Sequence, residues 1–199
     1  DALAQENVMT LNDMGIKKIV TACPHCLNTL QNEYPAFGGN YEVLHHTQMI
    51  EQLLSSGRSK LTQDIKSKVT FHDPCFLGRR NNEVEAPRKS LAAIKHLNTV
   101  EMKEHGKKSF CCGAGGGQMW KEEMEDTKRV NIERTEQALA TGADTIAVAC
   151  PFCMTMIEDG VKSKEAEEKV KVLDVAELVA RALDPASKKP RGEAKETAS

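Results

Sequence analysis

A short apolar segment that ends in Cys-Pro-x-Cys occurs twice in this chain. Residues 15–26 align without a gap on residues 142–153, and both segments close with this motif. The similarity resumes downstream, where residues 43–44 correspond to residues 172–173. A segment that recurs at a nearly constant offset is typical of a repeated structural unit. The sequence therefore predicts a duplicated module.

Each copy has the hydrophobic periodicity of an α/β unit. The expected order is an amphipathic helix, a short strand, the cysteine motif, a helix, a second strand and a last helix. The strands before the two motifs are expected at residues 19–22 and 145–149. Between the copies we expect strands over residues 68–72 and 99–103, and helices over residues 86–97 and 122–140.

This organisation predicts three parts. Residues 1–62 form the C-terminal remnant of a first module, and residues 63–183 form a complete second module. Residues 184–199 have no apolar period, which predicts a disordered tail.

Composition excludes several classes of protein. The 27 Lys and Arg residues balance 29 Asp and Glu residues, for a net charge of −2, so no nucleic-acid partner is expected. The apolar segments fall short of the ~20 residues that a membrane-spanning helix needs. The chain starts without the features of a secretory signal, and its seven cysteines suit a reducing compartment. We therefore expect a cytoplasmic location.

Five cysteines of the second copy are candidate metal ligands. They lie where a predicted strand ends or in a glycine-rich turn, and the carboxyl ends of parallel strands share one edge of a sheet. A proline after the first cysteine of each motif suits a helix N-terminus, whose free N–H groups stabilise a thiolate. Five thiolates exceed the four that zinc takes, which favours an iron–sulfur centre. A four-cysteine cluster, or zinc with one free thiol, stays open. The candidates are Cys75, Cys111, Cys112, Cys150 and Cys153.

Three other residues are candidates for supporting such a centre. Gly113 and Gly115 follow the Cys-Cys pair, where missing side chains let the backbone approach a bulky ligand. His72 precedes Asp-Pro-Cys75, where it suits either a hydrogen bond to the centre or a proton relay. A structural histidine at the end of a strand is the equally weighted alternative.

The cysteine spacing resembles a known family. Cys75-x35-Cys111-Cys112-Gly-x36-Cys150-x2-Cys153, with His72-Asp-Pro-Cys-x-Leu-Gly-Arg, resembles the cysteine-rich CCG domain found in heterodisulfide reductases. The same domain occurs in the iron–sulfur proteins of glycolate and lactate oxidation and in membrane-associated iron–sulfur oxidoreductases. The resemblance covers about residues 1–183. It implies that the five cysteines hold a [4Fe-4S] cluster, which is non-cubane in heterodisulfide reductase, with zinc as the alternative.

The first copy departs from the family. Family members usually carry two complete motifs, but Cys23 and Cys26 have no leading cysteine and no Cys-Cys pair before them. We therefore expect a C-terminal fragment of a longer protein, with Cys23 and Cys26 as ligands of an incomplete second metal site. Upstream parts would carry any membrane contact and place the full-length protein at the cytoplasmic face of the membrane.

These features lead to one hypothesis and two alternatives. The hypothesis is an iron–sulfur subunit of an oxidoreductase, which relays electrons from a flavoprotein or ferredoxin-type donor to a quinone or disulfide. The protein would supply thiolates and burial, with no catalytic residue beyond the cluster. The alternatives are a zinc-stabilised docking module of a larger redox protein, and a dithiol–disulfide oxidoreductase that works through Cys23 and Cys26.

Colour tests the hypothesis. We expect the anaerobically purified chain to be brown, with broad visible absorption, because an iron–sulfur centre absorbs through sulfur-to-iron charge transfer. Zinc thiolate is colourless because its d shell is filled. An absorption spectrum without a visible band would contradict the iron–sulfur hypothesis.

Overall fold

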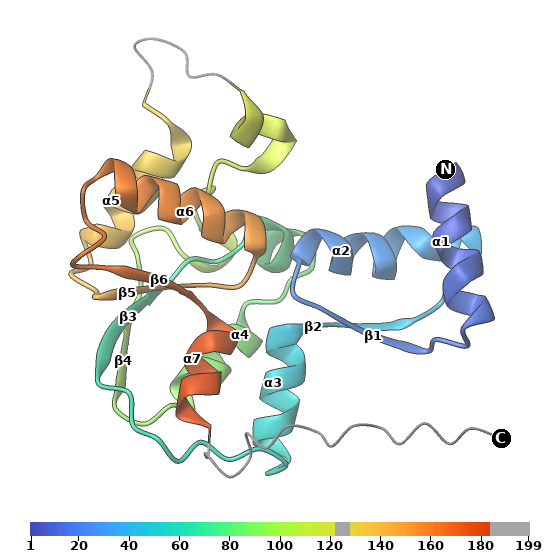
Figure 1. Cartoon of the computed structure of the whole chain (residues 1–199), viewed down its shortest axis with the longest axis horizontal. Coiled ribbons are helices and arrows are strands. Elements are labelled where there is room, and N and C mark those ends of the chain that lie inside the picture. Colours follow the sequence, from blue (N-terminus) through green and yellow to red (C-terminus); the bar gives the residue numbers. More distant parts are fainter. Residues whose placement is uncertain (122–127, 184–199) are drawn as a thin grey trace, which may run out of the picture.

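The computed structural model describes residues 1–121 and 128–183, in which two sheets of parallel strands are flanked by helices (Figure 1). Every paired strand is parallel to its neighbour, as the α/β prediction requires. The first sheet contains β1 (Lys18–Thr21) and β2 (Glu42–His45). The second has the order β4 (Leu97–Val100), β3 (Ser67–Phe71), β5 (Thr145–Val148), β6 (Lys171–Asp174).

Seven α-helices and several short turns connect these strands in the described part of the chain. None of these helices is both long and apolar enough to cross a bilayer. The helices are α1 (Ala2–Asp13), α2 (Pro24–Asn28), α3 (His46–Ser55), α4 (Glu85–Ala92), α5 (Val130–Leu139), α6 (Pro151–Ser163) and α7 (Val175–Ala182). The turns are π-helical at Thr29–Glu33 and Phe76–Arg80, and 3-10 at Tyr34–Phe37, Gly106–Lys108 and Gly115–Trp120.

The duplication predicted from the sequence is present in three dimensions. The order α1-β1-α2-β2-α3 recurs as α5-β5-α6-β6-α7. The second strand of each copy ends in a capping box, with the His45 side chain over α3 and the Asp174 side chain over α7. The two copies also meet here, because Nε2 of His46 lies 2.8 Å from Oδ1 of Asp174.

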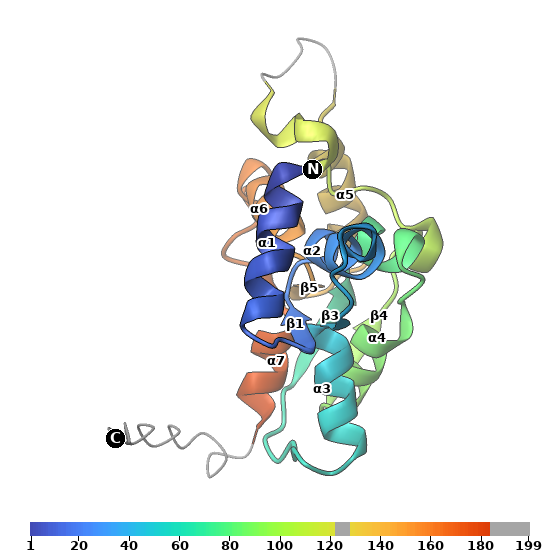
Figure 2. The same ribbon diagram turned by 90° about the vertical axis from the view of Figure 1, so that its right-hand side faces the viewer.

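The core lies on both faces of the four-stranded sheet. On β5, Ile146 and Val148 pack with Ile157 of α6, whereas Ala147 packs with Leu178 of α7 on the opposite face. Figure 1 shows α5 and α6 above these strands and α4 and α7 below them. In the view of Figure 2, α3, α4 and α7 gather in the lower half, and each contacts the other two. A parallel sheet covered on both sides has strands that are apolar throughout, and β5 is fully buried.

Three elements differ from their predicted bounds: two helices, and the strand expected over residues 99–103, which is β4 at Leu97–Val100. The helix expected over residues 86–97 ends at Ala92, and β4 begins at Leu97. His96, whose φ of 62° lies in the left-handed region, excludes a helix that continues to residue 97. Within the described residues, the helix expected over 122–140 begins at Val130, because Arg129 is extended.

Other predictions fall outside the described residues. They are the first part of that helix, residues 122–127, and the disordered tail, residues 184–199. The boundaries of the three predicted parts stay predictions.

The packing of α5 against α6 can be tested at Gly160. A Cβ atom there would collide with Oγ1 of Thr135 and lie 3.1 Å from the backbone oxygen of Asn131. We expect Gly160→Ala to lower the free energy of unfolding by about 1–3 kcal/mol through overpacking. Urea unfolding measures the change, and Gly115→Ala is the control, because a Cβ at Gly115 meets no atom within 4 Å. An unchanged midpoint for Gly160→Ala would contradict this helix packing.

Candidate metal centre

The cysteines gather at the carboxyl ends of the strands. Cys150 follows β5 and is the N-cap residue of α6, and Cys23 occupies the same position between β1 and α2. Cys75 follows β3 and precedes the π-helical turn Phe76–Arg80. Parallel strands place these ends on one edge, where Cys112, Cys150 and Cys153 form a separate buried cluster with Met156.

Six thiols form a continuous series in this region. Side-chain interactions link neighbouring thiols, and all seven cysteines of the chain are free of disulfides. The order of the series is Cys75, Cys111, Cys112, Cys153, Cys150 and Cys23. The structure therefore brings together the five cysteines of the complete second motif.

Cys23 is an unexpected member of the series. The sequence pairs it with Cys26 in a predicted first site, and no local motif indicated its interaction with Cys150. The interaction arises because the two Cys-Pro-x-Cys turns face each other across the junction of the copies. The His25 ring lies 4.2 Å from that of Phe76 and 5.5 Å, edge-on, from that of Phe152. Cys26 is exposed at this junction.

Two thiols of the series are stabilised as thiolates. Hydrogen bonds with Cys153 and Cys23 lower the pKa of Cys150 to about 2, and the N–H groups at the start of α6 act in the same direction. Interactions with Cys112 and Cys75 likewise lower the pKa of Cys111 to about 2. The helix N-terminus predicted from Pro151 thus acts on Cys150.

The flanking thiols show the opposite shift, because each donates to an anion. The interaction with Cys111 raises the pKa of Cys112 to about 11 and that of Cys75 well above its usual range. The pKa values of Cys23, through Cys150, and of Cys153, through Cys112 and Cys150, shift in the same direction. Each thiolate therefore lies between two thiol donors.

The Cys111-Cys112 pair lies in a turn that requires glycine. The backbone N–H of Gly113 donates to Sγ of Cys111 at 3.3 Å, and Gly113 has a φ of 91°. A Cβ there would lie 3.2 Å from the backbone nitrogen of Asn131. Gly113 thus permits both the left-handed turn and the close contact with α5. A Cβ at Gly115 would meet open space, so the structure gives that residue no comparable constraint.

His72 lies against the buried thiols. One of its ring nitrogens and the Sγ atoms of Cys112 and Cys153 all lie within 4.8 Å of one another. Burial, followed by the charge of Arg134, lowers the pKa of the imidazole to about 3. His72 is therefore a neutral side chain beside the series.

Asp73 holds the loop that carries Cys75. Its carboxylate accepts from Arg88 at 2.6 and 2.9 Å and from the backbone N–H of Gly106 at 2.7 Å. Its backbone oxygen accepts from the hydroxyl of Ser109 at 3.1 Å. These bonds tie the Cys75 loop to the segment that leads into Cys111.

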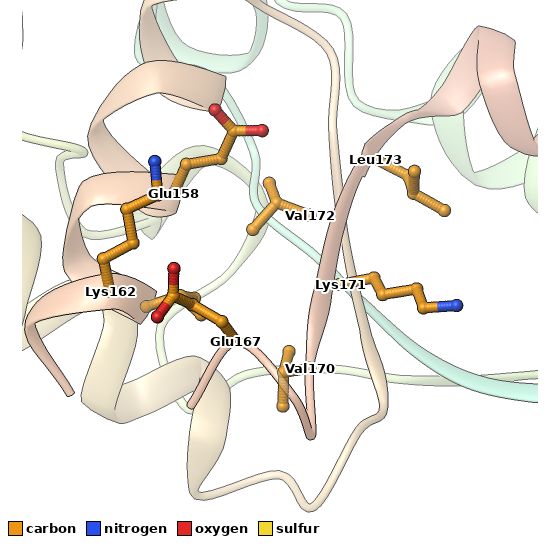
Figure 3. Close-up of a pocket in the computed structure, with 8 residues that line it drawn as sticks. Glu158, Lys162, Glu167, Val170, Lys171, Val172 and Leu173 are labelled. Atoms are coloured by element: carbon orange, nitrogen blue, oxygen red, sulfur yellow. The ribbon is translucent and has the colours of Figure 1, made fainter. Parts of the chain in front are cut away.

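A pocket elsewhere in the molecule does not share this chemistry. It lies between α6 and β6, has a volume of about 300 Å³ and is lined by Glu158, Lys162 and Glu167 together with the start of β6 (Figure 3). Among the lining residues that the structure describes, there is no cysteine. The cysteine series is the better candidate for a functional site.

The chemistry of the series fits an iron–sulfur centre. Its donors are sulfur atoms, which select iron–sulfur clusters, zinc and copper(I). Six sulfur atoms exceed the four positions of tetrahedral zinc. Three of the thiols are buried, and the thiolates receive backbone N–H groups of the kind that hydrogen-bond to cluster sulfurs. The residues present therefore fit an iron–sulfur cluster.

Comparisons with known proteins agree with this chemistry. A family model described as a cysteine-rich domain, CCG, matches residues 1–31 and 69–158. The chain is 45% identical over 181 residues to the probable iron-sulfur-binding oxidoreductase FadF of Bacillus subtilis (strain 168). It is also 45% identical over 188 residues to EtfAB:quinone oxidoreductase of Syntrophomonas wolfei subsp. wolfei. A third relative, at 37% identity over 185 residues, belongs to the dihydromethanophenazine:CoB--CoM heterodisulfide reductase of Methanosarcina barkeri.

The matched region is only a part of each relative. The three matches cover 91%, 92% and 91% of this chain but 26%, 26% and 44% of those proteins. The chain thus spans about a quarter of the length of the first two relatives.

The role of Asp73 can be tested by Asp73→Asn. The change removes the charge that pairs with Arg88 and turns one acceptor into a donor that faces the N–H of Gly106. We expect the free energy of unfolding to fall by about 1–3 kcal/mol, because buried donors lose their acceptor. Glu101→Gln is the control, since Glu101 pairs with the same arginine at the surface and contributes at most about 1 kcal/mol. Equal shifts in urea unfolding for both variants would contradict the assigned role.

Proposed function

Because the chain belongs to the cysteine-rich CCG domain family, we propose that it is an iron–sulfur electron-transfer domain of a larger oxidoreductase. The observation that carries the proposal is the continuous series of thiols at the carboxyl ends of the strands. Two of its relatives are named an iron-sulfur-binding oxidoreductase and a quinone oxidoreductase.

Five cysteines would hold the cluster. They are the residues of the complete second motif: Cys75, Cys111, Cys112, Cys150 and Cys153. When bound, a [4Fe-4S] cluster, cubane or non-cubane, supplies one-electron redox chemistry at protein-tuned potential. The chain supplies thiolates that are already stabilised, a buried floor made by Cys150 and Cys153, and N–H donors from Gly113 and the start of α6.

The centre is open on one side, as electron exchange with a partner requires. Cys75 and Cys111 are partly exposed, whereas Cys112, Cys150 and Cys153 are buried. We propose that a flavoprotein or ferredoxin-type donor passes electrons to this domain. The name of the Syntrophomonas relative supports a quinone as the acceptor. The heterodisulfide reductase relative supports a disulfide as the other acceptor class.

Residues 1–62 fit the role of one part of a first module. In the second copy, β5 pairs with β6 on one edge and β3 on the other. Among the described residues, β1 pairs with β2 alone, so its second edge suits a strand equivalent to β3 from elsewhere in the longer protein. Cys23 and Cys26 would then be ligands of a first site next to Cys150. Other parts of that protein would provide contact with the cytoplasmic face of a membrane.

Metal and sulfide analysis of the anaerobically purified chain tests the proposal. We expect about four iron and four sulfide per chain in wild type, as a [4Fe-4S] cluster requires. Cys112→Ser should lose most of both, because it removes a buried member of the series. Cys26→Ser is the matched control and should keep them, because Cys26 is exposed and outside the five-cysteine set.

Two other results would support the alternative functions, a zinc-stabilised module or a dithiol oxidoreductase. One zinc per chain with no sulfide would replace the proposal by a zinc-stabilised docking module. A metal-free chain that exchanges disulfides, and loses this activity in Cys26→Ser, would replace it by a dithiol oxidoreductase.

A further inference from the structure

The buried end of β3 contains a second kind of group beside the sulfur atoms. His72 is 1% exposed, and one of its ring nitrogens lies within 4.8 Å of the Sγ atoms of both Cys112 and Cys153. An imidazole in this position has two alternative roles. Either Nε2 offers a lone pair and ligates a metal, or it carries a proton and donates a hydrogen bond to sulfur.

Arg134 of α5 distinguishes the two roles. Its Nε donates to Nδ1 of His72 at 2.9 Å. An arginine has only donors, so Nδ1 must be the acceptor, and the proton of the neutral ring must then reside on Nε2. A histidine that ligates a metal through Nε2 has the reverse arrangement, with Nδ1–H donating to a carboxylate or carbonyl.

The guanidinium has little freedom to turn away. Arg134 is fully buried, and its other nitrogens are also used. Nη1 donates to the backbone oxygen of Glu104 and to Oε1 of Gln137, both at 2.8 Å. Nη2 donates to the hydroxyl of Ser109 at 3.0 Å. The donor that faces His72 is therefore fixed from three directions.

The remaining ring nitrogen lacks a partner. Nε2 of His72 is buried and makes no hydrogen bond within the described part of the protein. A buried N–H without an acceptor is costly, and the sulfurs of Cys112 and Cys153 lie beside the same ring. The site is thus prepared for an acceptor that carries negative charge.

We propose that Arg134 is a positioning residue that fixes His72 as the Nε2–H tautomer, so that His72 donates an N–H···S hydrogen bond to the sulfur centre held by Cys112 and Cys153. His72 is then excluded as a metal ligand. The identity of the centre as a cluster rests on the proposed function, whereas the tautomer does not. Hydrogen bonds to cluster sulfurs stabilise the more negative, reduced state, so this bond raises the reduction potential.

The experiment uses the anaerobically purified chain and three variants. His72→Phe removes the donor without changing the net charge, and Arg134→Lys keeps the charge but removes the Nε–H donor. Arg181→Lys is the matched control, because Arg181 is an exposed arginine in the last turn of α7 and makes the same change of side chain. Circular dichroism and thermal unfolding establish which variants fold.

Three readouts follow. Iron and sulfide content should be the same in His72→Phe as in wild type, because His72 is not a ligand. The reduction potential should become more negative in His72→Phe and Arg134→Lys and stay at the wild-type value in Arg181→Lys. With ¹⁵N-labelled histidine, nitrogen NMR of the purified wild type should show Nε2 protonated and Nδ1 bare, and electron–nuclear double resonance of the reduced form should show only weak nitrogen coupling.

Several results would overturn the inference. They are a protonated Nδ1, the strong nitrogen coupling of a ligand, loss of iron from folded His72→Phe, or an unchanged potential in that variant. If Arg134→Lys does not fold, the tautomer of the wild-type histidine and the reduction potential of His72→Phe still test the inference. Wild type without iron would refute the proposed function instead, and the nitrogen spectrum would still decide the tautomer.

Discussion

Stabilisation of thiolates that are partly or fully removed from water is the constraint on which the rest of this structure depends. An anionic sulfur removed from water needs hydrogen-bond donors. Cys150 receives them from the start of α6 and from neighbouring thiols, and Cys111 receives them from Gly113 and from thiols on both sides. The parallel sheet matters because it brings these donors and acceptors, which are distant in sequence, to one edge.

The end of β3 is held from both faces of the sheet. His72 accepts from Arg134 of α5, and the adjacent Asp73 accepts from Arg88 of α4. Since α5 and α4 cover opposite faces, consecutive side chains of one strand end are each fixed by an arginine from a different layer. The position of Cys75, two residues later, therefore depends on the packing of both layers. Neither arginine could be assigned this role from the sequence.

Local features of the chain were predictable, and contacts between distant segments were not. The apolar residues of β5 next to Cys150 predicted a buried strand and a helix N-terminus, because both signals lie within a few residues. The Cys23 interaction depends on how two copies pack, which no local spacing encodes. Arg134 left one signal, since it shares the buried stripe of α5 with Asn131 and Ala138, where a polar residue requires partners. His96 is left-handed and excludes a helix that continues to residue 97, and sequence periodicity does not report such a conformation.

The helix caps of the two copies make the halves of the molecule different where they meet. Where one copy uses His45 to begin its last helix, the other uses Asp174, and His46 has become the partner of that aspartate. The contact joins positions that are not equivalent, because His46 corresponds to Val175 and Asp174 corresponds to His45. Replacing His46 by the valine of the other copy, or Asp174 by the histidine of the other copy, would remove the contact. The two halves of the molecule are therefore not interchangeable at the point where they meet.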